Sequence, residues 1–139
     1  MRFMVMVRST PEIESGVLPT TEELAAMGAF NERLAKAGVL LEGEGLQPSA
    51  KGARIHFDGE KRTVIDGPFA ETKELIAGYW IVNMKSKDEA IEWFRQAPCF
   101  KNGGTLEIRQ LFEADDFGET FTPELREQEA RLGIGGLGK

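Results

Sequence analysis

The chain has 139 residues, 41% of them hydrophobic and 29% charged, and its formal net charge is −6. This length and composition predict a single soluble globular domain with a sizeable core. The basic residues are scattered along the chain rather than gathered in a stripe, which argues against direct binding to nucleic acid. No apolar run is long enough for a membrane span, and the single cysteine, Cys99, agrees with a reducing compartment, so we expect a cytoplasmic protein.

The first half of the chain predicts a strand, a loop, a helix and a second strand. Residues 2–8 are apolar on both faces of an extended strand. Residues 9–19 predict a long loop, a candidate lid or rim. Thr20 and Glu23 form a capping box that begins a helix. Its predicted apolar stripe is Leu24, Met27, Phe30 or Asn31, Leu34 and Ala37. Gly38 ends this helix, and a strand follows from residue 39 to near Pro48.

The second half begins with a predicted hairpin and then repeats the strand, helix and strand. Residues 53–57 and 62–65 flank an Asp-Gly turn, which indicates a hairpin. A strand over 76–84 leads to a second capping box at Ser86 and Glu89, and a last strand covers 106–112. The predicted buried face of the second helix is Ala90, Ile91, Phe94 and Ala97. This order predicts an α+β domain over residues 1–112, a ferredoxin-like split βαβ plan with an inserted β-hairpin. Residues 113–139 form an acidic extension with a short helix that begins at Thr122-Pro123.

The central strands predict a homodimer. Trp80 and Val82 point to one side of their strand and Tyr79 and Ile81 to the other, so a sheet with helices on one face leaves an apolar face uncovered. Face-to-face pairing of two copies would cover it. The alternative is that the hairpin or the extension covers this face within one chain.

The segment Asp66-Gly67-Pro68-Phe69-Ala70-Glu71-Thr72-Lys73-Glu74 closely resembles the signature of the YCII-related (DGPF) family of small bacterial proteins. The resemblance extends to residues 37–46, 88–93 and 107–109. It implies a dimeric α+β barrel, and it implies association with extracytoplasmic-function sigma factors as a protein partner. One branch of the family is thought to use a His–Asp pair with the histidine on the first helix. The predicted first helix here, residues 21–37, contains no histidine, so that pair is not carried over.

Asp66 is the candidate catalytic residue, with two interpretations left open. Its carboxylate could accept backbone N–H groups in the turn, a common role for aspartate. Alternatively it acts as a general base or orienting group, with a pKa raised by burial beside Phe69 or Tyr79. Of the neighbouring charges, Glu71, Lys73 and Glu74 are candidate binding residues because they match the family signature. Charged groups in such a segment are otherwise usually solvated.

Four further residues are candidate binding groups. His56, the only histidine, lies in the predicted hairpin, where solvent exposure is the alternative to a chemical role. Arg8, Arg109 and Tyr79 lie on predicted strands and could bind a carboxylate or enolate, although Arg109 could equally pair with Glu107. A His/Cys metal site is excluded by one histidine and one cysteine, whereas a site with oxygen ligands alone is not.

Two functions follow from these residues and from the resemblance. The first is a protein that binds a small organic molecule in a cleft near Asp66, with any catalysis being acid–base chemistry without a cofactor. The second is a non-catalytic module that contacts a sigma factor or another protein.

Overall fold

The computed structural model describes residues 1–136. Residues 137–139, the end of the predicted extension, lie outside the described residues. The chain divides into two compact units, Met1–Arg109 and Gln110–Lys139. Each unit is described by itself.

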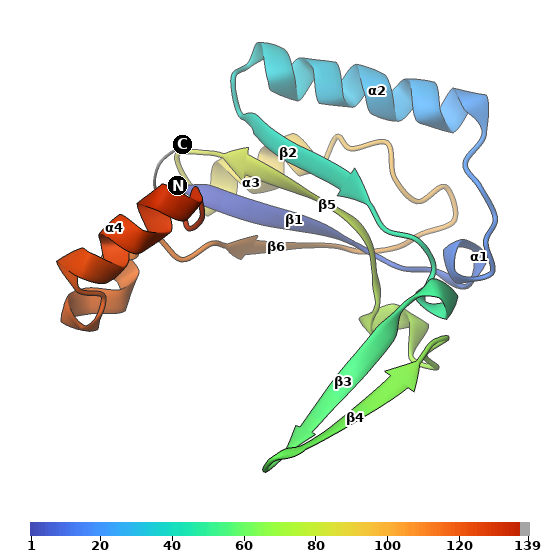
Figure 1. The fold of residues 1–139 in the computed structure, drawn as a ribbon. Coiled ribbons are helices and arrows are strands. Elements are labelled where there is room, and N and C mark those ends of the chain that lie inside the picture. Colours follow the sequence, from blue (N-terminus) through green and yellow to red (C-terminus); the bar gives the residue numbers. More distant parts are fainter. Residues whose placement is uncertain (137–139) are drawn as a thin grey trace. The chain divides into compact units, whose positions relative to one another are not determined.

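The first unit is built on a four-stranded sheet with the order β2-β5-β1-β6. Its strands are β1 (Arg2–Arg8), β2 (Leu40–Gly45), β5 (Ile76–Asn83) and β6 (Leu106–Gln110). Strand β5 runs antiparallel to both β1 and β2, and thus lies between two strands that precede it in the sequence. The crossover helices are α2 (Thr21–Lys36) and α3 (Lys87–Phe94) (Figure 1). This is the predicted ferredoxin-like split βαβ arrangement. The sheet of the single chain does not close into a barrel.

The core lies between the helices and one face of this sheet. Phe30 of α2, Trp80 of β5 and Phe94 of α3 pack as three aromatic rings, with centroids 5.1–6.2 Å apart. Trp80 Nε1 donates a hydrogen bond of 2.8 Å to Asn31 Oδ1. Phe30 and Asn31, the two alternatives for one position of the predicted stripe, therefore both contact the core. The predicted stripe is wrong at both ends. Leu24 is 59% exposed because the core contacts of α2 begin at Met27, and Ala37 is exposed because α2 ends at Lys36.

The capping residues predicted from the sequence are only partly confirmed at the ends of α2 and α3. Thr20 and Glu23 form the predicted capping box, and Gly38 (φ 75°) follows α2. At α3, Ser86 accepts the Glu89 N–H as predicted, but the Glu89 carboxylate accepts the N–H of Lys85 rather than that of Ser86. The second box is therefore only half formed. The predicted buried face of α3 is confirmed at Ala90 and Phe94, which are buried. Ile91 is only half-buried, and Ala97 follows the end of the helix.

The predicted loop over residues 9–19 contains a helical turn, α1 (Pro11–Glu14). Thr10 caps it by accepting the Ile13 N–H, and Pro11 occupies its first turn. Proline is favoured there because the first N–H groups of a helix have no intrahelical acceptor. The expectation of an open loop was wrong over these residues.

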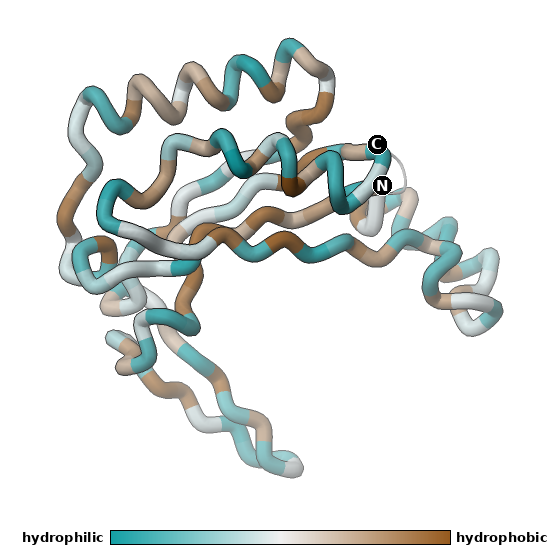
Figure 2. Tube along the Cα trace, turned by 180° about the vertical axis from the view of Figure 1, so that it is seen from behind, coloured by the Kyte–Doolittle hydropathy of each residue, from teal (hydrophilic) through white to brown (hydrophobic). Residues whose placement is uncertain are grey.

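The inserted hairpin consists of β3 (Ala53–Asp58) and β4 (Lys61–Asp66), which form a separate two-stranded sheet. The two strands meet at a Gly59-Glu60 turn, as the Asp-Gly signal predicts. Hydrophobic and hydrophilic residues alternate along the hairpin (Figure 2). All twelve strand residues are exposed.

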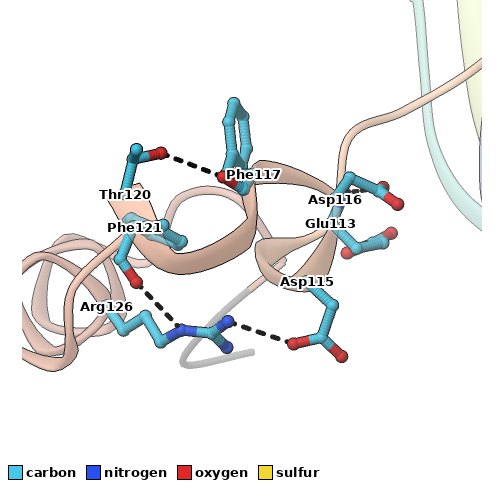
Figure 3. A network of polar contacts seen from close by, with 7 residues as sticks. All are labelled: Glu113, Asp115, Asp116, Phe117, Thr120, Phe121 and Arg126. Atoms are coloured by element: carbon cyan, nitrogen blue, oxygen red, sulfur yellow. Dashed lines mark hydrogen bonds and ion pairs between the residues drawn. The ribbon is translucent and has the colours of Figure 1, made fainter.

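The second unit contains a short 3-10 segment, Ala114–Thr120, and α4 (Pro123–Leu132), which is capped by Thr122 as predicted. Phe117 packs between Phe112 and Phe121, with ring centroids 4.8 and 5.6 Å away. Arg126 donates to Asp115 at 3.0 Å and to the Phe121 carbonyl oxygen at 3.4 Å (Figure 3). The predicted last strand over residues 106–112 is too long, since β6 ends at Gln110.

Candidate functional site

The signature segment, residues 66–74, follows β4 and turns sharply against the residues after β2. Gly67 N donates a hydrogen bond of 2.9 Å to the Gly52 carbonyl oxygen, and the Gly67-Pro68 peptide is cis. A Cβ atom at position 67 would overlap the carbonyl oxygen of Ser49. This close approach of two backbones explains why the turn needs glycine.

Glu14 and Ser49 anchor the segment, and neither was predicted. Glu14 on α1 accepts the Ser49 N–H at 2.9 Å and also accepts the Ser49 hydroxyl. Ser49 Oγ in turn accepts the Phe69 N–H at 3.0 Å. A chain of hydrogen bonds therefore links α1, the 3-10 turn at Ser49–Lys51 and the signature segment. Glu14 precedes Ser49 by 35 residues, and no local pattern in the sequence connects the two.

Arg8 holds the other end of the segment to the main sheet. Its Nε donates to the Lys73 carbonyl oxygen at 3.0 Å, and its Nη1 lies 3.4 Å from Glu107 Oε1. Arg109 Nη1 lies 3.6 Å from the other oxygen of Glu107, and its side chain is 73% exposed. Arg8 is thus engaged with protein groups, whereas Arg109 presents most of its guanidinium to solvent.

These arginines lie on the sheet face opposite the helices, which we call the open face. Its register places Met4 beside Ile81 and Met6 beside Tyr79, because directly paired residues share a face. The open face comprises Met4, Met6, Arg8, Glu42, Glu44, Tyr79, Ile81, Glu107 and Arg109. An apolar centre is therefore flanked by carboxylates on β2 and by an Arg–Glu–Arg cluster on β1 and β6.

Tyr79 is the polar group at the centre of the open face. Its hydroxyl donates to Glu42 Oε1 at 3.0 Å. This hydrogen bond, followed by partial burial and the charges of Glu42 and Glu44, raises the pKa of the Tyr79 phenol. Glu42 and Glu44 are both exposed on the edge strand β2.

Asp66 is exposed at the end of β4, opposite Ala53. Across residues 1–136, its carboxylate has no hydrogen bond or ion pair. The adjacent turn amide, that of Gly67, donates to Gly52 instead. Among the described residues, the Asp66 carboxylate is therefore neither bound by turn amides nor buried, which are the two arrangements that its interpretations required.

The remaining predicted residues do not converge on Asp66. Phe69 lies under the guanidinium of Arg54, whose Cζ is 3.8 Å from the ring centroid. His56 is exposed on β3, and the side chains of Glu71, Lys73 and Glu74 are exposed. The structure brings together Arg8, Arg109 and Tyr79 on the open face.

Cys99 packs against the core and is half-buried, and burial raises the pKa of its thiol. A raised pKa lowers the thiolate fraction, which agrees with a packing role. Within residues 1–136 no group of three or more His, Cys, Asp or Glu side chains is arranged to hold a metal ion. Over the same residues, no helix has both the length and the apolar character needed to cross a membrane.

Comparisons with known proteins give one family. The YCII-related domain profile matches residues 1–115. Uncharacterized protein R00369 of Rhizobium meliloti (strain 1021) is 31% identical over 86 residues, which are 61% of this chain and 69% of that protein. Among solved structures, 5-chloro-2-hydroxyhydroquinone dehydrochlorinase (TftG) from Burkholderia phenoliruptrix AC1100, in complex with 2,5-dihydroxybenzoquinone, has a TM-score of 0.45 and 16% identity, covering 81% of this chain and 95% of that one. On the profile match and the sequence relative, the chain belongs to the YCII-related domain family.

Proposed function

We propose that this protein is a homodimer that binds a small organic anion on the open face, between Tyr79 and Arg109. The observation that carries the proposal is the combination on one sheet face of an apolar centre with a phenol and a largely exposed guanidinium. Small-molecule sites typically have this composition, with an apolar lining and a few convergent polar groups.

The chemistry of the polar groups favours a ligand with a carboxylate or enolate. Within residues 1–136, Arg109 has one ion-pair contact, to Glu107, and a guanidinium can bind a second carboxylate through two parallel N–H groups. The Tyr79 hydroxyl donates its one proton to Glu42, so it offers a ligand its ring and an acceptor oxygen, while the guanidinium of Arg109 supplies the donors for an anion. The flanking carboxylates of Glu42 and Glu44 would repel an anion, so its charged end would lie on the β1–β6 side of the face.

The second copy would close this site. Both crossover helices pack on the opposite sheet face, and the open face has no covering helix of the first unit. Stacking two open faces would exclude water around Met4 and Ile81 and strengthen the attraction between Arg109 and an anion. Proton transfer without a cofactor is the chemistry that such a site could support.

A thermal-shift screen with a panel of aromatic and aliphatic carboxylates tests the proposal. We expect at least one carboxylate to raise the melting temperature of the wild-type protein and of the Arg95→Gln variant, but not that of Arg109→Gln. Arg95 is a matched control because its side chain is 71% exposed and pairs with one glutamate, Glu92, as Arg109 pairs with Glu107. Equal shifts in the two variants, or no shift with any carboxylate, would contradict the proposal.

A second candidate function is a protein-interaction module, and the second unit favours it. No residue of α4 is buried, and the unit exposes several large apolar side chains. These are Phe112, Phe117, Leu125, Leu132 and Ile134, which are 45–66% exposed. The family resemblance makes an extracytoplasmic-function sigma factor the partner to test. Calorimetric titration should show binding that is lost in the Phe117→Ser variant; no heat with the wild-type protein would refute this function.

A further inference from the structure

The β3–β4 hairpin, residues 53–66, exposes several large apolar side chains, and we call it the arm. In the described part of the chain, its two strands pair with each other and with no other strand. Ile55, Phe57 and Val64 are 56%, 70% and 64% exposed. An isolated two-stranded hairpin is marginally stable in water, and exposed apolar side chains on one of its faces indicate an interaction surface.

The register divides the arm into two different faces. Ile55 pairs with Val64 and Phe57 pairs with Arg62, so these four side chains share one face, with Ala53 and Asp66 at its base. We call this the apolar face of the arm. The other face carries Arg54, His56, Asp58, Lys61, Thr63 and Ile65. On that other face, Arg54 lies over Phe69 of the signature segment, so this face of the arm already contacts a residue of its own chain.

The apolar face is self-complementary about its centre. At its base it carries a small and an anionic residue, Ala53 and Asp66. Near its tip it carries a large and a cationic residue, Phe57 and Arg62. Ile55 and Val64 lie midway. A two-fold axis through this middle pair would place Arg62 of one copy against Asp66 of the other, and Phe57 against Ala53.

We propose that the apolar faces of two arms pack on each other across such a two-fold axis, with a second copy of this chain as the occupant. A two-fold interface requires the same patch on both copies, and the arm supplies opposite charge and unequal size at matching positions. In this arrangement Asp66 contributes to dimer formation, because it pairs with Arg62 of the other copy.

Both charged groups have unused hydrogen-bonding capacity for this contact. Arg62 stacks on Phe57, with its Cζ 4.4 Å from the ring centroid, and its Nη1 donates to the carbonyl oxygens of Gly59 and Lys61. A guanidinium has five N–H groups, so donors on the remaining nitrogens are left for a carboxylate. The Asp66 carboxylate has no hydrogen bond or ion pair within the described part of the chain.

The arm contact supplements the open-face interface and rests on the proposed homodimer. A face of three residue pairs is small compared with the about 800 Å² that each partner buries in a standard stable interface. The arms would therefore tighten and orient a dimer that the open faces also hold.

A charge-exchange experiment on the full chain tests the pairing. Dimer dissociation constants are measured by sedimentation velocity for wild type, Arg62→Asp, Asp66→Arg and the double variant. Each single change places like charges together across the axis and should weaken the dimer at least about tenfold, whereas the double variant should return to within about threefold of wild type. Lys61→Asp, a similar charge change on the other face of the arm, should leave the constant unchanged.

The outcomes separate this inference from the proposed homodimer. A monomeric wild-type protein would refute the homodimer itself. A dimeric wild type whose single variants are unaffected, or whose double variant fails to recover, would refute only the arm pairing. If a charge variant fails to fold, crosslinking decides: in a Cys99→Ser background, a short bismaleimide should link Val64→Cys copies and not Thr63→Cys copies. Equal linking of the two would overturn the inference.

Discussion

Replacing Glu14 with alanine should lower the free energy of unfolding by about 2–3 kcal/mol, because it removes an acceptor for two donors of Ser49. Hydrogen bonds to charged groups contribute about 1.5–3 kcal/mol each, so two would contribute about 3–6 kcal/mol, and the half-buried position of Glu14 lowers the expected loss to about 2–3 kcal/mol. Since Ser49 also accepts the Phe69 N–H, the loss should loosen the signature segment as well as α1.

Urea denaturation monitored by tryptophan fluorescence measures the global effect, because Trp80 is buried in the core. Amide hydrogen exchange at Phe69 measures the local effect. Glu14→Gln, which keeps one acceptor oxygen, should lose about half as much stability as Glu14→Ala. Glu12→Ala is the matched control, since Glu12 lies exposed on the same helix. Equal stabilities of Glu14→Ala and Glu12→Ala, with unchanged exchange at Phe69, would refute the anchoring role of Glu14.

Three other substitutions probe the same architecture. Gly67→Ala should destabilise the fold by at least about 2 kcal/mol in urea denaturation, because its Cβ would overlap the Ser49 backbone; a loss below about 0.5 kcal/mol would contradict the close approach. Tyr79 is the only tyrosine, so ultraviolet titration measures its phenol alone. The pKa of Tyr79 should lie above 10.0 and should fall in the Glu42→Gln variant. The stability contributed by the Tyr79–Glu42 hydrogen bond should be complete below the pKa of the unfolded state and should be lost as the pH rises through the raised pKa of the folded state. An unchanged titration in Glu42→Gln would refute that hydrogen bond. Ser9→Ala should be neutral or stabilising by up to about 1 kcal/mol, because within residues 1–136 the buried Ser9 hydroxyl has no partner; a clear loss of stability would mean that it has one.

Local signals were sufficient for most elements and for the strand order. The capping box at Thr20 and the Asp-Gly turn at Asp58 depend on neighbouring residues only, and both formed as predicted. The split βαβ order followed from the alternation of strand and helix patterns, since few topologies accommodate that order. Within α1, the Thr10-Pro11 start signal was present in the sequence, but the glycine and two prolines of residues 9–19 favoured a loop.

The candidate site depends on contacts that a single sequence does not record. Period-two alternation predicts that Tyr79 and Ile81 share a strand face, and pairing in the sheet then adds Met4 and Met6. By contrast, the anchoring of Phe69 through Ser49 needs segments brought together by the fold. The role of Asp66 was left between a carboxylate bound by the turn amides and a buried general base, and within residues 1–136 this carboxylate is exposed and has no hydrogen bond or ion pair.

The mass of the protein in solution tests most directly whether two copies stack through the open face. Light scattering of the wild-type chain should give twice the 15.4 kDa of one chain, and an Ile81→Lys variant should give 15.4 kDa, because a long charged side chain would replace the apolar contact beside Met4 and would have to lose its hydration between the stacked faces. A wild-type mass of 15.4 kDa across the concentration range, or an Ile81→Lys variant that remains a dimer, would contradict the account.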